Sequence, residues 1–157
     1  MNSQMPPKKN KPKIVLASGV FDLLHLGHVK FLEEAKKVGG KNAELVVIVA
    51  RDSTVEDTKD RKPIMPENQR CALVESLKIV DREILGSENL DLDNVIQTVK
   101  PDIIALGYDQ SGMESRVKDY VKSHKLNIKV VRVGKFEADE LDSSSKIRQK
   151  IVEKSSR

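Results

Sequence analysis

Two histidines, three residues apart, are the side chains in this 157-residue sequence best suited to phosphate chemistry. His25 and His28 lie in Gly19-Val-Phe-Asp-Leu-Leu-His-Leu-Gly-His28, where a helical pattern of apolar residues begins. Positions three apart share one side of a helix, and the free amides and dipole at a helix N-terminus favour anions. The pattern predicts a site that binds phosphate oxygens and stabilises charge developing on them. Gly27, between the histidines, would let a nucleotide approach the backbone.

Other interpretations of the histidine pair remain open at this stage. A His-x-x-His pair also suits a metal ion, but no third ligand stands nearby, so no metal site is predicted. The two histidines can equally be ordinary polar residues at a helix start. The segment matches neither G-x-x-x-x-G-K-[ST] nor G-x-G-x-x-G, which excludes a P-loop and a dinucleotide fingerprint.

The elements that must position these residues alternate along the chain from Ile14 onward. Apolar periodicity predicts strands over 14–19, 44–50, 79–85, 102–106 and 128–133, and helices over 26–38, 67–77, 90–99, 113–124 and 143–152. The polar stretch 51–66 is expected to be a long loop. This order predicts an α/β fold: a single Rossmann-like domain over 13–157 with a five-stranded, parallel, doubly wound sheet. Residues 1–12 are expected to be a flexible basic tail.

Ligands of such sheets bind beyond the carboxyl ends of the strands, close to the topological switch point. Asp109 follows the fourth strand, where its carboxylate suits a ribose or base but also an Asx turn. Phe136 follows the fifth strand and either packs on a base or covers a core edge. Arg61 and Arg70 flank the long loop, where they suit substrate phosphates or remain solvated charges.

Two segments together give a specific resemblance. The histidine segment resembles the HxGH signature of the cytidylyltransferase-like nucleotidyltransferase superfamily, and Ser143-Ser-Ser-Lys-Ile-Arg148 resembles its Ser/Thr-rich turn at the start of the last helix. Members transfer a nucleoside monophosphate from a nucleoside triphosphate and release pyrophosphate. The resemblance covers about residues 14–152. Within it, segments 48–55, 61–67 and 105–110 are most similar to archaeal FAD synthases.

This resemblance implies an enzyme that transfers AMP from ATP to FMN, yielding FAD and pyrophosphate, with Mg²⁺ carried by the triphosphate. It implies His25 and His28 as catalytic residues, and Arg61 and Arg70 as contacts to substrate phosphate. The implied nucleotide-binding residues are Val20, Phe21, His25, Leu26, Gly27, His28, Asp109, Phe136, Ser144, Ser145 and Arg148. The sequence departs from the family at Val20, where threonine is common, and at Leu26, where proline is frequent. CTP-dependent transfer to glycerol 3-phosphate and a noncatalytic nucleotide-binding module are the alternatives.

Composition narrows the remaining function classes. The net charge of +4 comes from the ends, because 1–13 and 143–157 each carry +4 and 14–142 carry −4. With only two Tyr, three Phe and no Trp, a base-stacking platform and hence a nucleic-acid partner are not expected. No apolar run approaches the roughly 18 residues of a membrane span, so no membrane partner is expected. The single cysteine fits a reducing cytoplasm, and the resemblance suggests a homodimer.

Overall fold

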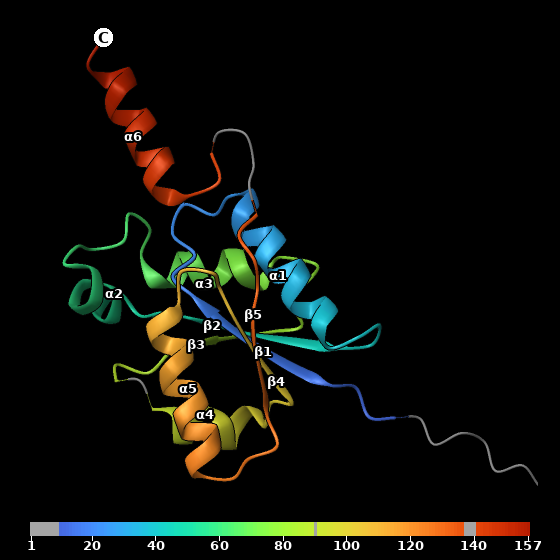
Figure 1. The fold of residues 1–157 in the computed structure, drawn as a ribbon. Helices are drawn as coiled ribbons and strands as arrows, with labels where there is room; N and C mark the ends of the chain where they lie inside the picture. Colours follow the sequence, from blue (N-terminus) through green and yellow to red (C-terminus); the bar gives the residue numbers. More distant parts are fainter. Residues whose placement is uncertain (1–9, 90, 137–140) are drawn as a thin grey trace, which may run out of the picture.

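Five parallel strands form one sheet in the order β3-β2-β1-β4-β5 in the computed structural model, which describes residues 10–89, 91–136 and 141–157 (Figure 1). The strands are β1 (Ile14–Gly19), β2 (Glu44–Val49), β3 (Arg82–Leu85), β4 (Ile103–Leu106) and β5 (Lys129–Arg132). β1, the central strand, and its neighbour β2 carry the longest apolar runs, as burial on both faces requires. The predicted α/β class and five-stranded parallel sheet are confirmed.

Helices cover both faces of the sheet (Figure 1). They are α1 (Leu26–Val38), α2 (Asp52–Lys59), α3 (Glu67–Glu75), α4 (Leu92–Val99), α5 (Ser111–Ser123) and α6 (Ser144–Ser155). Leu32 of α1 and Val74 of α3 belong to one core cluster. Ile96 of α4 and Val117 of α5 belong to the other, on the opposite face. By contrast, α6 buries no residue and projects away from the sheet.

The stretch 51–66 is not simply a loop, as the sequence suggested, because residues 52–59 form α2. This helix buries only Val55, so its sequence shows no apolar periodicity. It ends at Asp60, which adopts the left-handed conformation with φ 52°. The third strand starts at Arg82 and not at residue 79, because a turn closes first through the Val80 N–H···O=C Leu77 bond of 3.0 Å. The other element ends agree or differ by at most three residues, and Leu90 and most of the 1–12 tail lie outside the described residues.

The strand order places a switch point beside the histidine segment. From β1 the chain moves outward through β2 to β3, then returns to pair β4 on the other side of β1. Within β1, Ala17 pairs with Val47 of β2 and with Ala105 of β4. The turn that follows β1 therefore opens into the crevice between two oppositely wound halves, which is where ligands of this fold class bind.

Candidate active site

A cavity of about 1240 Å³ lies at this carboxyl edge of the sheet. Its walls come from the turn after β1, the starts of α1 and α6, from α2, and from the segments after β4 and β5. The sequence-predicted site residues that line it are Val20, Phe21, His25, Gly27, His28, Arg61, Asp109, Phe136, Ser144, Ser145 and Arg148. Leu26 and Arg70 do not line it. Residues from opposite ends of the chain thus share one cavity.

The turn between β1 and α1 is held in an unusual backbone conformation. Phe21 and Leu23 have positive φ angles of 55° and 48°, which cost non-glycine residues about 1–3 kcal/mol each. Phe21 is nevertheless 2% exposed and packs on the His28 ring, with 5.4 Å between ring centroids. Its side chain therefore packs against one of the two histidines, and the nucleotide contact expected at Phe21 stays a prediction. Leu26, also expected to contact nucleotide, is 51% exposed outside the cavity.

Asp22 fastens this turn to two other segments, a role that sequence reasoning missed. Its carboxylate is 4% exposed and accepts the backbone N–H groups of Ile64, at 2.8 Å, and Met65, at 2.9 Å. Its carbonyl oxygen accepts the hydroxyl of Ser144 at the start of α6. Asp22 thus joins the histidine segment to the loop after α2 and to the Ser-rich helix start.

The two histidine rings stack, with 3.7 Å between centroids and 24° between planes. His25 is the N-cap of α1, and its backbone N–H donates to Nδ1 of His28 at 3.2 Å. Since Nδ1 of His28 accepts, the neutral ring carries its proton on Nε2. Nδ1 of His25 is buried without a hydrogen-bond partner among the described residues. Both rings therefore retain hydrogen-bonding capacity for a ligand.

Burial keeps both rings neutral at physiological pH. Desolvation lowers the pKa of His28 from 6.5 to about 3, with further lowering by the charges of His25 and Lys59 and an opposing effect of Asp22. Desolvation also lowers the pKa of His25, against the attraction of Asp142. Lys59, near enough to influence His28, is another residue that the sequence did not single out. A bound polyanion would offset the desolvation and favour the protonated rings.

A pH titration tests this assignment. Since the folded-state pKa of His28 lies below that of the unfolded chain, the folded form resists protonation. The stability that the buried, neutral His28 ring contributes is complete above about pH 6.5 and is lost as the pH falls towards about 3. We expect the His28 ring protons, followed by NMR, to keep one chemical shift from about pH 8 to about pH 5. An ordinary titration midpoint near pH 6.5 would contradict the burial seen here.

The start of α6 faces α1 across the cavity. Ser143 is its N-cap and accepts the Lys146 N–H at 3.2 Å, while Ser145 accepts from Nη2 of Arg148 at 3.2 Å. Nη1 of Arg148 is buried, 3.8 Å from a carboxylate oxygen of Asp22. Burial and the nearby positive charge of Arg61 lower the pKa of Arg148. Two arginines that repel each other beside a helix N-terminus make a site suited to an anion.

Close packing requires a glycine at position 27, and the sequence did not suggest this reason. A Cβ at this position would lie 2.6 Å from the backbone oxygen of Asp142 and 2.9 Å from the His25 ring. The segment preceding α6 therefore packs directly on α1. Asp142 in turn forms an ion pair of 2.5 Å with Lys146, which lowers the pKa of its carboxyl.

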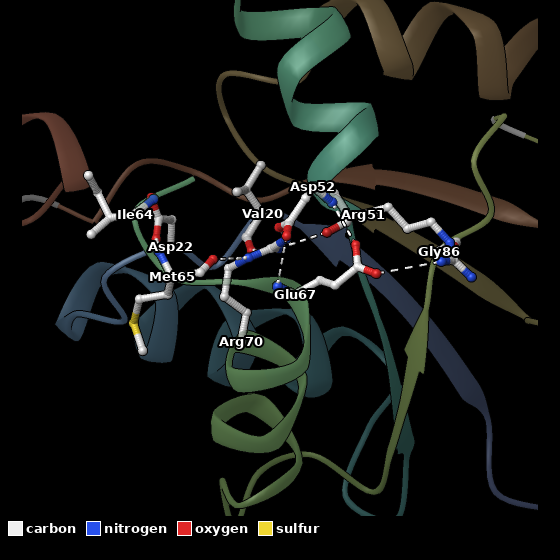
Figure 2. A network of polar contacts seen from close by, with 10 residues as sticks. Val20, Asp22, Arg51, Asp52, Ile64, Met65, Glu67, Arg70 and Gly86 are labelled. Carbon is white, nitrogen blue, oxygen red and sulfur yellow. Dashed lines mark hydrogen bonds and ion pairs between the residues drawn. The ribbon is translucent and has the colours of Figure 1, made fainter. Parts of the chain in front are cut away.

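Arg70 does not have the geometry of the phosphate contact expected from the sequence. Its side chain is 0% exposed and crosses the ends of two strands (Figure 2). Nη1 donates to the carbonyls of Val20 and Ala50, both at 2.7 Å. Nε donates to Met65 O at 3.0 Å, and Nη2 pairs with the Asp52 carboxylate at 2.6 Å. Arg70 therefore ties β1, β2 and the loop after α2 together beneath the cavity.

The Asp52 end of this network fixes the starts of α2 and α3. Asp52 N–H donates to Glu67 at 2.8 Å, and Glu67 N–H donates back to Asp52 at 3.3 Å. Arg51 bonds the Gly86 carbonyl at 2.6 Å and lies 3.5 Å from a Glu67 oxygen, as Figure 2 shows. Each of the two acidic residues thus caps the other's helix. The sequence does not reveal this arrangement, because the two residues lie 15 positions apart.

The segments after β4 and β5 form the remaining wall. The turn after β4 is closed by Gln110, whose side chain accepts the Gly107 N–H at 2.8 Å. Asp109 is exposed on the cavity, and its carboxylate makes no hydrogen bond within the described ranges. Lys135 lies over the Tyr108 ring at 5.6 Å, and Phe136 is 37% exposed. The wall thus offers one carboxylate and two accessible aromatic rings.

Within the described ranges 10–89, 91–136 and 141–157, the chain has neither a cluster of metal ligands nor a membrane-spanning helix. No group of three or more His, Cys, Asp or Glu side chains there could hold a metal ion. No helix among the same residues is long and apolar enough to cross a membrane.

Comparison with known proteins agrees with this architecture. Residues 16–150 match the cytidylyltransferase-like family. The FAD synthase of Methanopyrus kandleri is 50% identical over 90% of this chain and 93% of its own, and that of Methanothermobacter marburgensis is 49% identical over 92% and 88%. A crystal structure titled lipopolysaccharide core biosynthesis protein, from Thermoplasma volcanium, is 47% identical with a TM-score of 0.71, covering 80% of this chain and 98% of that one. The chain therefore belongs to the cytidylyltransferase-like nucleotidyltransferase family.

Proposed function

We propose that this protein is an FMN adenylyltransferase, which transfers AMP from ATP to FMN and releases pyrophosphate. The observation that carries the proposal is the stacked His25 and His28 pair at the start of α1, facing the Ser-rich start of α6 across one cavity. Relatives named FAD synthase, 47–50% identical over most of the chain, support FMN as the acceptor.

The reaction is a direct displacement at phosphorus. A phosphate oxygen of FMN attacks the α-phosphorus of ATP, the bond from that phosphorus to the bridging oxygen breaks, and pyrophosphate leaves with the electron pair. The Nε2–H of His28 and the ring of His25 donate to the α-phosphate and to the bridging oxygen. Ser144, Ser145 and Arg148 hold the β- and γ-phosphates at the α6 N-terminus. Positioning and charge stabilisation account for most of the catalysis in such reactions.

No general base is needed, because an FMN phosphate is already ionised near neutral pH. The two histidines therefore serve as hydrogen-bond donors, and in the neutral His28 ring the donor is Nε2–H, because Nδ1 accepts the His25 N–H. A Mg²⁺ ion bound to the triphosphate would neutralise part of the negative charge of the phosphates. Lys59, at the end of α2, supplies positive charge for the acceptor phosphate, and Arg61, whose charge acts on Arg148, supplies it beside the α6 N-terminus.

The two substrates distinguish this proposal from its alternatives. The full chain is supplied with ATP and FMN, or with CTP and glycerol 3-phosphate, and pyrophosphate release is measured. We expect release with the first pair and little with the second. The reverse preference would identify a cytidylyltransferase. ATP binding without release from either pair would identify a noncatalytic nucleotide-binding module.

Cytoplasmic location and homodimer formation are part of the same proposal. Cys71 is a free cysteine, which suits a reducing compartment. The exposed apolar residues Ile151 and Val152 of α6 leave surface that a second copy can cover. Sedimentation of the intact chain measures whether it forms a homodimer.

A further inference from the structure

The cavity extends beyond the phosphate site along two different walls. One, here called the α1 wall, includes Lys30, Phe31, Glu33, Glu34, Lys37 and Val38. The other, here called the α2–α4 wall, includes Ile48, Thr54, Thr58, Ser87, Leu92 and Val95. The two walls lie toward opposite faces of the sheet, because Phe31 and Val38 pack against one core cluster and Ile48, Leu92 and Val95 against the other.

The phosphate geometry decides which wall the acceptor reaches. In the proposed reaction, pyrophosphate lies at the start of α6 and adenosine at the segments after β4 and β5. In-line attack requires the acceptor phosphate to approach from the side opposite the leaving pyrophosphate. On the α1 wall, Lys30 and Lys37 are already paired with Glu33 and Glu34, at 2.9 Å and 2.6 Å. Lys59, whose charge acts on His28, also lines the cavity and makes no ion pair among the described residues. Lys59 is the last residue of α2, so an acceptor phosphate held by it meets the α2–α4 wall first.

The chemistry of the two walls also differs. The α1 wall carries four charged side chains, at positions 30, 33, 34 and 37. The α2–α4 wall combines the apolar side chains of Ile48, Leu92 and Val95 with hydroxyls. An uncharged, flat ring system with one polar edge is better matched by apolar contacts and a few hydroxyls than by a row of charges.

One hydroxyl on the α2–α4 wall lacks a partner. Oγ1 of Thr54 is buried and makes no hydrogen bond within the residues that the structure describes. Thr58 lies one turn later on the same helix face, and its hydroxyl donates to the Thr54 carbonyl at 2.8 Å. A buried hydroxyl left unpaired costs about 1–3 kcal/mol, so a ligand atom that bonds Thr54 gains binding free energy.

We propose that the isoalloxazine ring of FMN lies against the α2–α4 wall, with the Thr54 hydroxyl bonded to its polar pyrimidine edge. This inference rests on FMN being the acceptor. It makes Thr54 a specificity-determining residue for the flavin. It also separates the flavin wall from the adenosine wall after β4 and β5.

Bulk added to each wall tests the placement. Thr58→Trp, at an exposed helix position, adds bulk to the α2–α4 wall and narrows the cavity there. Glu34→Trp, at another exposed helix position, adds the same bulk to the α1 wall. FMN binding to the full chain is measured by quenching of flavin fluorescence, and the KM for ATP by pyrophosphate release. We expect Thr58→Trp to raise the Kd for FMN about tenfold or more, with an unchanged KM for ATP. Glu34→Trp should leave both constants unchanged. A raised Kd in Glu34→Trp alone would overturn the placement.

A second pair of variants tests the hydroxyl without adding bulk. Thr54→Val keeps the shape of the side chain, whereas Thr54→Ser keeps the hydroxyl. We expect the Kd for FMN to rise about fivefold to tenfold in Thr54→Val and to stay near the wild-type value in Thr54→Ser. Equal affinities in all three proteins would contradict the bond to Thr54. Wild-type protein that binds FMN without forming FAD would contradict the proposed activity alone, and failure to bind FMN at all would contradict both.

Discussion

Replacing His28 with alanine is expected to lower kcat for FAD formation by about 10²–10³-fold, the usual loss when one donor to developing charge is removed. The structure gives the reason. Its Nδ1 is already occupied by the His25 N–H, so Nε2–H is the donor left for the α-phosphate. The loss should fall on kcat more than on the KM for ATP, because charge at the reacting phosphorus grows in the transition state. Steady-state kinetics of FAD formation measure both constants.

His124→Ala is the matched control for this variant. His124 caps the end of α5 and stacks on Tyr120, with 4.0 Å between ring centroids, and it does not line the cavity. Its replacement should leave kcat within about twofold of wild type. Circular dichroism melts of both variants separate lost chemistry from lost folding. Near-wild-type turnover in a folded His28→Ala protein would remove the basis for the catalytic assignment.

Replacing Arg70 with methionine is expected to lower the free energy of unfolding by about 3–5 kcal/mol, because the variant loses several hydrogen bonds from a charged group and each contributes about 1.5–3 kcal/mol. The variant removes the guanidinium that binds Val20 O, Ala50 O and the Asp52 carboxylate. Two strand-end carbonyls lose a side-chain donor that is itself 0% exposed. Urea denaturation followed by circular dichroism measures the change. The same loss should loosen the histidine turn, which begins at Val20.

Arg82→Met provides the comparison for the stability measurement. Arg82 is 47% exposed and pairs with Glu44 at 2.8 Å, and exposed ion pairs contribute only about 0–1 kcal/mol. A loss in Arg70→Met no larger than that in Arg82→Met would mean that the network in Figure 2 does not hold the strand ends together.

The sequence predicts those elements whose signals are local. The apolar runs of β1, β2 and β4 and the periodicity of α1 follow from nearest neighbours, and their bounds agree within one residue. The helix α2 escapes prediction because one buried residue, Val55, leaves no apolar stripe. Its packing depends on the Asp52–Arg70 pair, whose members lie 18 residues apart.

The candidate site shows the same division. The histidine pair and the serine turn are recognisable as short motifs, and the structure brings them into one cavity. The residues that fix their geometry are recognised only in three dimensions. Asp22 bonds Ile64 across 42 residues and Ser144 across 122. A buried arginine such as Arg70 also reads as an ordinary surface charge when only its sequence neighbours are known.

Product formation by the full-length protein tests the central claim most directly. The protein is incubated with ATP, FMN and Mg²⁺, and FAD is separated by chromatography while pyrophosphate is measured in the same samples. The proposed reaction predicts one FAD for each pyrophosphate, with both products depending on His28. Binding of ATP and FMN without FAD, or pyrophosphate release with CTP and glycerol 3-phosphate in its place, would contradict the assignment as an FMN adenylyltransferase.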